Sequence, residues 1–139
     1  MRIGPYLHGD ARLVRARDHD DIIDLVEQQA VAGPAFTVVA GVVPIGCGGV
    51  VIIWPGVGEA WALASERIAE YPMITRLTKK ILATIMHEGG LHRIGAWALV
   101  EQPRNQRWLQ ALGFVEEGIS KHYLTDRRDV IRYGLVRGV

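Results

Sequence analysis

The feature that most constrains this chain is an apolar strand followed almost at once by an amphipathic helix. Its apolar residues recur with the 3.6-residue period of one helix face: Met73, Ile74, Leu77, Ile81, Leu82, Ile85 and Met86. Pro72 suits a first helical position, and Gly89-Gly90 supplies a stop. The sequence therefore predicts a strand over Glu59–Ser65 and a helix from about Pro72 to His87.

A strand that leads into a helix N-terminus suggests a site for an anion. The first turn of a helix presents unpaired backbone N–H groups and the positive end of the helix dipole, which together favour a phosphate. One hypothesis is therefore a cofactor that carries phosphate. The alternative is an ordinary strand-helix unit with no ligand, because every such junction has this arrangement.

The other elements follow from periodicity and from turn residues. We expect a strand over 11–17, a helix from about His19 to Gln29 capped by Asp18, a hairpin of Phe36–Ala40 with Ile45–Trp54, a strand over Arg93–Val100, a short helix opened by Pro103, and a hairpin of Phe114–Tyr123 with Val130–Val136. The strands Glu59–Ser65 and Arg93–Val100 should be parallel neighbours, because a helix separates them. Gly113 should cap the short helix.

Composition limits the class of protein. With 139 residues, one domain over 1–139 is expected. A net charge of +1 provides no overall field for nucleic acid or an acidic membrane. Cys47 is the only cysteine, which excludes an internal disulfide and fits a reducing cytoplasm. The five histidines show no metal-ligand spacing, and no apolar run reaches the length of a membrane span, so we expect no metal and a soluble protein.

The segment from Glu101 to Phe114 carries the most specific motif. It resembles the second conserved motif of the GNAT superfamily of acetyl-CoA-dependent N-acetyltransferases, a helix with an early asparagine, here Asn105, that ends in Leu112-Gly113-Phe114. The resemblance covers roughly 11–136 in the order of elements. It implies an α/β fold with a mixed, mostly antiparallel sheet of about six or seven strands and helices on both faces.

The resemblance also implies a site for acetyl-CoA. In the family, the central strand pairs with the pantetheine arm, and a glycine-rich loop holds the pyrophosphate. The corresponding cofactor residues here are Leu63, Ala64, Ser65, Met73, Ile74, Thr75, Arg76 and Asn105. The loop itself, 70–78, contains no glycine, and Pro72 lacks an N–H donor, so this is a divergent member for which we expect weak binding. Arg76, Lys79 or Lys80 either supplies the missing charge or is only a solvated side chain.

Glu59 is the candidate general base. It lies four residues before Leu63, the spacing at which some members of the family carry a catalytic glutamate, and an acetyl transfer to an amine needs the neutral amine. The alternative is a glutamate beside a turn, pointing at solvent. The family's frequent general acid, a tyrosine of the second motif's helix, corresponds to Leu109 here.

Two functions are therefore expected as alternatives. The first is a GNAT-type N-acetyltransferase that moves an acetyl group from acetyl-CoA to a small-molecule or peptide amine. The second is a GNAT-fold protein of weak or lost activity that acts as a binding or assembly module, as in some similar phage or prophage proteins. The sequence leaves the substrate undefined and a homodimer open.

Overall fold

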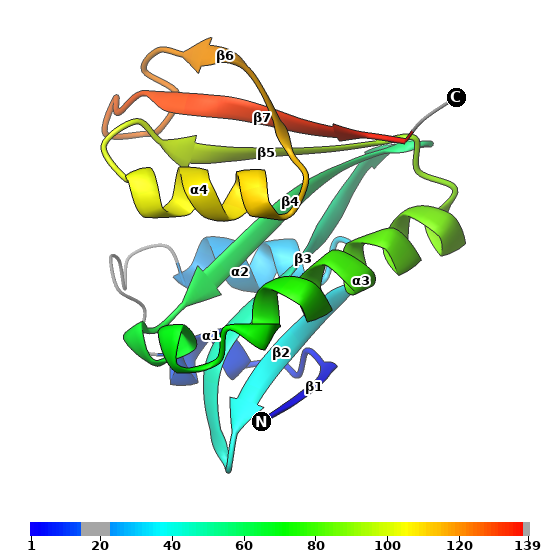
Figure 1. Cartoon of the computed structure of the whole chain (residues 1–139), viewed down its shortest axis with the longest axis vertical. Coiled ribbons are helices and arrows are strands. Elements are labelled where there is room, and N and C mark those ends of the chain that lie inside the picture. The colour runs from blue at the N-terminus through cyan, green and yellow to red at the C-terminus, as the bar shows by residue number, and fades with distance from the viewer. Residues whose placement is uncertain (15–22, 138–139) are drawn as a thin grey trace. The chain divides into compact units, whose positions relative to one another are not determined.

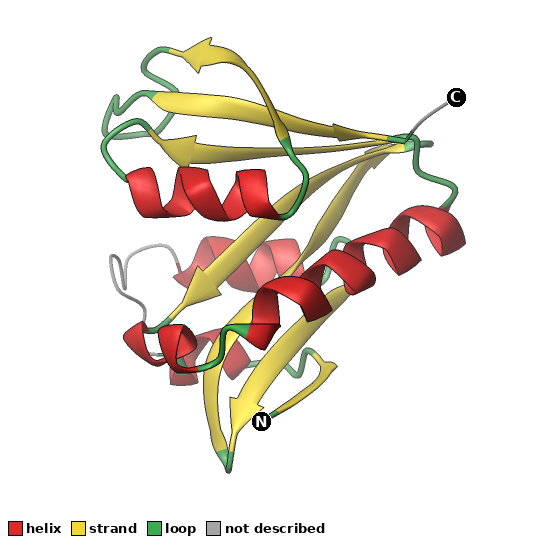
Figure 2. Cartoon of the chain, viewed as in Figure 1, coloured by secondary structure: helices red, strands yellow, loops and turns green. Residues whose placement is uncertain are grey.

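A computed structural model describes residues 1–14 and 23–137 (Figure 1). The chain divides into two compact units, Met1–Ile53 with Glu59–Ile74 and Trp54–Gly58 with Thr75–Val139. The described part holds a mostly antiparallel sheet of seven strands and four α-helices (Figure 2). The predicted fold class is confirmed. The prediction of a single domain stays a prediction.

The first unit contains four strands of the sheet, in the order β1-β2-β3-β4. Its elements are β1 (Arg2–Pro5), α1 (Asp10–Leu13), α2 (Ile23–Ala30), β2 (Ala35–Ala40), β3 (Val43–Trp54), β4 (Val57–Ala64), the 3₁₀ helix η2 (Glu66–Glu70) and the start of α3 (Met73–Gly89). β1 pairs antiparallel with β2, and β2 pairs antiparallel with β3 through a turn at Gly41, where φ is +64°. The predicted hairpin is confirmed.

A β-bulge interrupts the pairing of β2 with β3. Val39 lies opposite Pro44 and Val38 lies opposite Gly46, so Ile45 is an extra residue on β3. A bulge is a suitable place for Pro44, which has no N–H to donate to the ladder. Two consecutive residues thereby face the same side: Ile45 is in one core cluster with Val38, and a Cβ built at Gly46 would meet Ile68 on that side.

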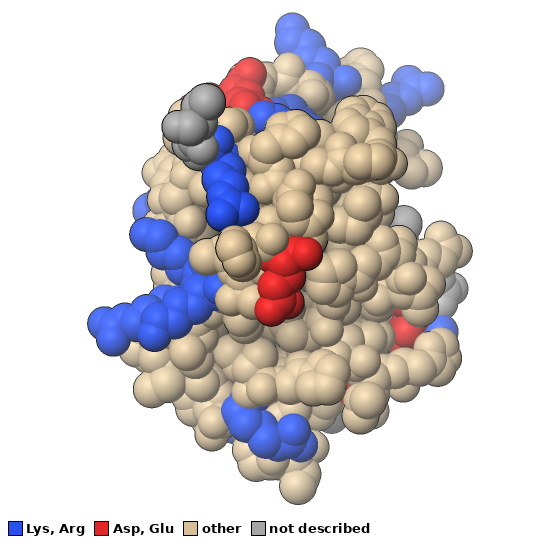
Figure 3. All heavy atoms as spheres, turned by 90° about the vertical axis from the view of Figure 1, so that its right-hand side faces the viewer, with Lys and Arg blue, Asp and Glu red and all other residues tan. Residues whose placement is uncertain are grey.

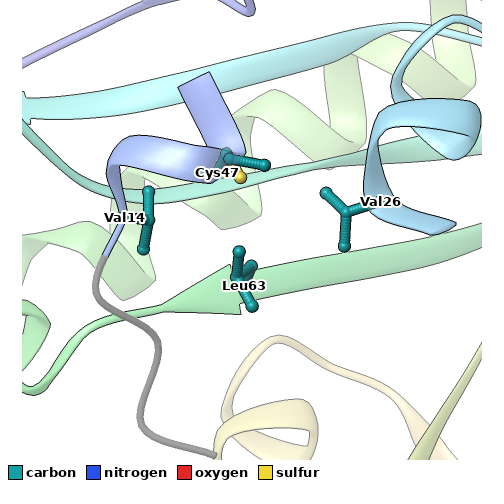
Figure 4. Close-up of a cluster of buried hydrophobic side chains, with 5 residues drawn as sticks. Val14, Val26, Cys47 and Leu63 are labelled. Atoms are coloured by element: carbon teal, nitrogen blue, oxygen red, sulfur yellow. The ribbon is translucent and has the colours of Figure 1, made fainter. Parts of the chain in front are cut away.

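Helical segments cover both faces of the first unit's strands. On one face, Cys47 packs in a buried cluster with Val14, Val26 and Leu63, and Figure 4 shows these side chains converging from the end of α1, from α2, from β3 and from β4. On the other face, Ile74 at the start of α3 packs in the cluster that contains Ile45. Both clusters are almost fully buried, which is the main source of stability for such a unit.

The second unit contains the other three strands, in the order β5-β7-β6. Its elements are the rest of α3, β5 (Arg93–Leu99), α4 (Pro103–Ala111), β6 (Val115–Ser120) and β7 (Val130–Val136). β7 pairs antiparallel with both β5 and β6, as Figure 1 shows. Gly113 ends α4 with φ of +101°, and the Phe114 N–H returns to the Leu109 carbonyl at 3.0 Å. The helix, its cap and the closing hairpin agree with the predictions.

The N-terminal predictions are partly wrong. Residues 11–13 of the expected strand over 11–17 belong to the short helix α1 (Asp10–Leu13), which the sequence did not indicate because four residues are too few to show a period. The strand β1 was not expected, since its four residues include Gly4 and Pro5. Positions 15–22 lie outside the described residues, and with them Asp18 and the start of the helix expected from His19. The parallel pairing of Glu59–Ser65 with Arg93–Val100 concerns strands of different units and stays a prediction.

Candidate cofactor and catalytic site

The connection from β4 to α3 begins at Ser65. The Ser65 N–H donates to the Ile45 carbonyl at 2.9 Å, which extends the pairing with β3 by one residue. The Ser65 hydroxyl then accepts from the Arg67 N–H at 3.3 Å and starts η2. A short 3₁₀ helix, Glu66–Glu70, therefore leads from β4 to the segment 70–78, where the resemblance implies a glycine loop, and Ser65 itself is buried.

Leu63 and Ala64 precede this point on β4. Leu63 is buried, and its side chain belongs to the cluster beneath α1 and α2. Ala64 is half-buried. The role of their backbone in holding a cofactor stays a prediction.

Two successive hydrogen-bonded turns lead into the start of α3. The Tyr71 N–H donates to the Ile68 carbonyl at 3.2 Å, and the Ile74 N–H donates to the Tyr71 carbonyl at 3.0 Å. Pro72 has no N–H. Ile74 is 5% exposed and Met73 is 58% exposed, so of the two side chains only that of Met73 extends into solvent. Fewer backbone donors remain here than at an open helix N-terminus.

Thr75 and Arg76 continue α3 within the second unit. The Thr75 hydroxyl accepts from the Trp108 indole N–H of α4 at 3.2 Å, a contact that nothing in the sequence pattern indicated. Arg76 is exposed. An exposed guanidinium near a helix start is placed to meet an anion from solvent.

Asn105 has a local partner in α4. Its side-chain amide donates to the Gln102 side-chain oxygen at 2.6 Å, one turn earlier and just before Pro103 opens the helix. The neighbouring Gln106 side chain donates to the Leu99 and Val100 carbonyls, both at 2.9 Å. The amide side chains of this motif therefore tie the helix start to the end of β5.

Glu59 lies on β4 and is half-buried, with one carboxylate oxygen buried. By the two-residue period of a strand it shares a face with Trp61 and Leu63, the face that α1 and α2 cover. The Trp61 ring meets the Tyr6 ring edge-on, with centroids 6.3 Å apart. Glu59 is therefore not simply a turn residue directed at solvent, and its catalytic role stays a prediction.

A cluster of polar side chains that the sequence did not indicate lies under α1 and α2. The Glu27 carboxylate accepts from the Gly9 N–H at 3.1 Å, and the Tyr6 hydroxyl accepts from the Ala11 N–H at 3.1 Å. Burial raises the pKa of Tyr6 to about 12, and burial together with the Asp10 and Glu27 carboxylates raises the pKa of Cys47 to about 12. No spacing in the sequence connects residues 6, 27 and 47, so only the fold could bring them together.

Other classes of site have little support among the described residues. No three or more His, Cys, Asp or Glu side chains in that part of the chain are grouped to hold a metal ion. No helix in it is long and apolar enough to cross a membrane. On the face drawn in Figure 3, Lys and Arg side chains stand in separate groups between uncharged atoms.

The fold is shared with known acetyltransferases. The chain is similar to a GNAT family acetyltransferase from Elizabethkingia anophelis with acetyl-CoA bound, with a TM-score of 0.77 and 16% identity over 98% of this chain and 97% of that one. It is similar to an IAA acetyltransferase from Bacillus cereus, with a TM-score of 0.78 and 14% identity over 98% and 99% of the two chains.

A third similar structure is a mutant of the spermidine N-acetyltransferase SpeG from Vibrio cholerae, with a TM-score of 0.72 and 19% identity over 98% and 95%. No protein-family model and no curated protein sequence matches the chain. The chain is therefore similar to these proteins in three-dimensional structure along almost its full length, although the sequence identity is low. The chain has the fold of the GNAT acetyltransferases.

Proposed function

We propose that this chain is an acetyl-CoA-dependent N-acetyltransferase that acts on an amine, with Glu59 as general base. The observation that carries the proposal is the position of Glu59, half-buried on the central strand β4 and four residues before the Leu63–Ser65 segment. The solved structures support it, since one similar protein has acetyl-CoA bound and another is a spermidine N-acetyltransferase. A cytoplasmic location belongs to the same proposal.

The chemistry that Glu59 would perform is a proton transfer. An alkylamine is protonated near neutral pH and cannot attack a carbonyl carbon in that form. A carboxylate that accepts the proton, directly or through one water, produces the nucleophilic amine. Bound acetyl-CoA would supply the activated acetyl group and a thiolate leaving group.

The residues between β4 and α3 fit the cofactor only in part. The backbone of Leu63 and Ala64 would hold a pantetheine chain. The Ser65 and Ile74 N–H groups, however, already donate to carbonyls within the protein, and Pro72 has no N–H group. Arg76 would therefore provide the charge that glycine-loop N–H groups usually provide. We propose weak binding, with a dissociation constant of about 0.1 mM or above.

The same connection favours a second candidate function. The η2 helix leads into the segment 70–78 that corresponds to the glycine loop, and the N–H groups of Ser65, Tyr71 and Ile74 donate to carbonyls within the protein. A chain with this connection and with Leu109 in place of a helix tyrosine would serve as a binding or assembly module, of the kind that the resemblance to phage proteins implies.

Calorimetry with acetyl-CoA tests the first candidate. At low salt the protein should bind with a dissociation constant of about 0.1 mM or above, and Arg76→Ala or added salt should weaken binding. Arg107→Ala, which removes an exposed guanidinium from α4, is the control and should change nothing. Release of free CoA thiol should then be measured with spermidine, a simple alkylamine and a peptide with a free N-terminus.

The outcomes separate the two candidates. Thiol release that depends on an added amine supports the enzyme. Micromolar binding that is insensitive to Arg76→Ala would remove the role of Arg76 while favouring the enzyme. The absence of both binding and thiol release at millimolar acetyl-CoA would favour the binding module.

A further inference from the structure

The first unit has a pocket beside its edge strand β1. The residues that line this pocket come from β1, from the segment between β1 and α1, from α1, from β2, from the turn after β2 and from the start of β3. Its volume is about 190 Å³, which is the space of roughly six water molecules. Pockets for drug-sized ligands usually measure about 300 to 1,000 Å³, so this one fits a smaller molecule.

The floor of the pocket is the face of the sheet on which α1 lies. Arg2 of β1 is directly opposite Val39 of β2, and in the next row Gly4 is opposite Thr37. Residues opposite each other on neighbouring strands point to the same face of a sheet. The Thr37 hydroxyl donates to the Asp10 carboxylate of α1 at 2.7 Å, which identifies this face. The Arg2 side chain therefore leaves β1 on the side where Asp10 lies.

Arg2 brings a positive charge to the pocket. A Cβ built at Gly4 would lie 3.6 Å from Arg2 Nη1, so the guanidinium extends along β1 over the position that the glycine leaves open. Within residues 1–14 and 23–137, the Arg2 guanidinium has no carboxylate or hydrogen-bond partner. A guanidinium is planar and carries five N–H donors, and it pairs best with a carboxylate. A ligand carboxylate would meet no competitor at this group.

Asp10 brings a negative charge to the same pocket. Its Oδ2 atom accepts from the Leu7 N–H at 2.9 Å and from the Thr37 hydroxyl at 2.7 Å. These two hydrogen bonds hold the side chain in one orientation, and Oδ1 accepts no hydrogen bond from the part of the chain that the structure describes. Oδ1 is therefore the oxygen available to a ligand. Because a carboxylate only accepts hydrogen bonds, an ammonium group suits it.

Apolar side chains surround these two charges. Leu7 is 66% exposed, Leu13 is 61% exposed and Val42 is 93% exposed, and all three line the pocket. Leu13 is three residues after Asp10 on α1, so both lie on one face of the helix. An aliphatic ligand group in the pocket would remove part of this apolar surface from water, which is favourable.

We propose that this pocket binds a free aliphatic α-amino acid such as leucine. The ligand carboxylate pairs with the Arg2 guanidinium, the ammonium group pairs with Asp10 Oδ1, and the side chain packs against Leu13 and Val42. A simple carboxylate would leave Asp10 unpaired and a simple amine would leave Arg2 unpaired, so the two charges together select a zwitterion. The site does not depend on the acetyl-transfer proposal, because none of its residues belongs to the candidate cofactor or catalytic group.

The test uses leucine and three analogues that each lack one part of it. The compound 4-methylpentanoate lacks the ammonium group, 3-methylbutylamine lacks the carboxylate, and glycine lacks the aliphatic side chain. Binding is measured by calorimetry and by saturation-transfer NMR on the ligand protons. Leucine should bind at least about tenfold more tightly than each analogue, because each analogue loses one charge pair or the apolar contact.

Variants then assign each charge of the ligand to one residue. Arg2→Met should weaken leucine about tenfold and leave 3-methylbutylamine unchanged. Asp10→Asn keeps one oxygen for the Leu7 N–H and the Thr37 hydroxyl, and it should weaken leucine about tenfold without weakening 4-methylpentanoate. Arg67→Met is the control, because Arg67 is an exposed cation of the same unit that does not line the pocket. Thermal unfolding shows whether each variant is folded.

A further variant separates this pocket from the proposed acetyl-transfer site, since leucine is itself an amine. Glu59→Gln should leave the leucine affinity unchanged. Leucine binding that is lost in Glu59→Gln and retained in Arg2→Met would assign leucine to the acetyl-transfer site and overturn the proposal.

Three other results would also overturn the proposal. One is equal or tighter binding of 4-methylpentanoate or 3-methylbutylamine, which would mean that the pocket does not select a zwitterion. Another is leucine binding that folded Arg2→Met leaves unchanged. The third is the absence of leucine binding at about 10 mM. If Asp10→Asn does not fold, the comparison of leucine with 4-methylpentanoate on the unchanged protein still tests the ammonium contact.

Discussion

The Arg93 guanidinium of β5 reaches across β7 to the Glu117 carboxylate of β6, with Nη1 to Oε2 at 2.8 Å and a second contact from Nη2 to Oε1. Gly134 of β7 lies beneath this pair, and a Cβ built there would be 2.5 Å from Glu117 Oε2. The absence of a side chain at Gly134 therefore lets one bidentate ion pair connect the two outer strands of the second unit. The hydrogen bond from Arg93 and its charge lower the pKa of Glu117.

The ion pair should make stability depend on pH. The pKa of Glu117 is lower in the folded protein than in the unfolded chain. The contribution of the ion pair to the free energy of unfolding is therefore fully present above the unfolded pKa of about 4.3, and it is lost as the pH falls through the pKa of the folded protein. Glu117→Gln should lower the free energy of unfolding by no more than about 1 kcal/mol at pH 7, since both side chains are about one-third exposed. Urea unfolding at pH 7 and near pH 2 measures this. An equal loss for Glu117→Gln at both pH values would contradict the charge-based origin.

Gly89 and Gly90 should respond oppositely to the same substitution. Gly90 has φ of +62°, whereas Gly89 is the last residue of α3 and a Cβ built there would make only ordinary contacts with Leu91. Gly90→Ala should lower the free energy of unfolding by about 1 kcal/mol, and Gly89→Ala should leave it unchanged or raise it by up to about 1 kcal/mol. Chemical denaturation of the pair checks the prediction, and equal effects would refute the left-handed conformation at Gly90.

Cys47 should be inert in the folded protein. Its thiol is buried, and with a pKa of about 12 only about one molecule in ten thousand carries the reactive thiolate at pH 8. A thiol reagent such as DTNB should therefore react slowly in buffer and at the rate of a free cysteine in denaturing urea. Rapid reaction of the folded protein would mean that the cluster around Cys47 opens readily.

Glu59→Gln tests the catalytic hypothesis directly. If Glu59 is the general base, the substitution should lower turnover by roughly 10²- to 10⁴-fold at neutral pH with little change in acetyl-CoA affinity. Glu70→Gln, an exposed glutamate of η2 that pairs with Arg67, provides the matched control. Full activity of the Glu59 variant would return Glu59 to a structural role.

The predictable part of the fold is the part with strong local signals. The apolar period of α3, the turn at Gly41 and the cap at Gly113 each reflect a preference of a few adjacent residues. The strand β1 and the helix α1 lack such a signal. β1 forms because it pairs with β2, and α1 is held by contacts such as the Thr37 hydroxyl donating to the Asp10 carboxylate at 2.7 Å. Both depend on residues far away in the sequence.

The candidate site also has features that the sequence indicates and features that depend on the fold. The strand, the helix and the missing glycines could be found from the sequence, because each is a matter of residue type at a position. The internal use of the Ser65 and Ile74 N–H groups could not be found, since it depends on where the Ile45 and Tyr71 carbonyls lie. The pocket that Arg2 and Asp10 line likewise joins residues on separate elements that share no periodicity.

The bulge at Ile45 has a consequence for how chains of this kind can differ in length. Pro44 and Gly46 already lie opposite the adjacent residues Val39 and Val38, so removal of Ile45 would leave every other cross-strand pair of the hairpin in place. The cost would be one buried side chain and the Ile45 carbonyl that accepts the Ser65 N–H, and the register of β2 with β3 would survive. Related sequences can therefore gain or lose a single residue here during evolution, whereas the same change at the Thr37–Cys47 pair would reverse the faces of the strand.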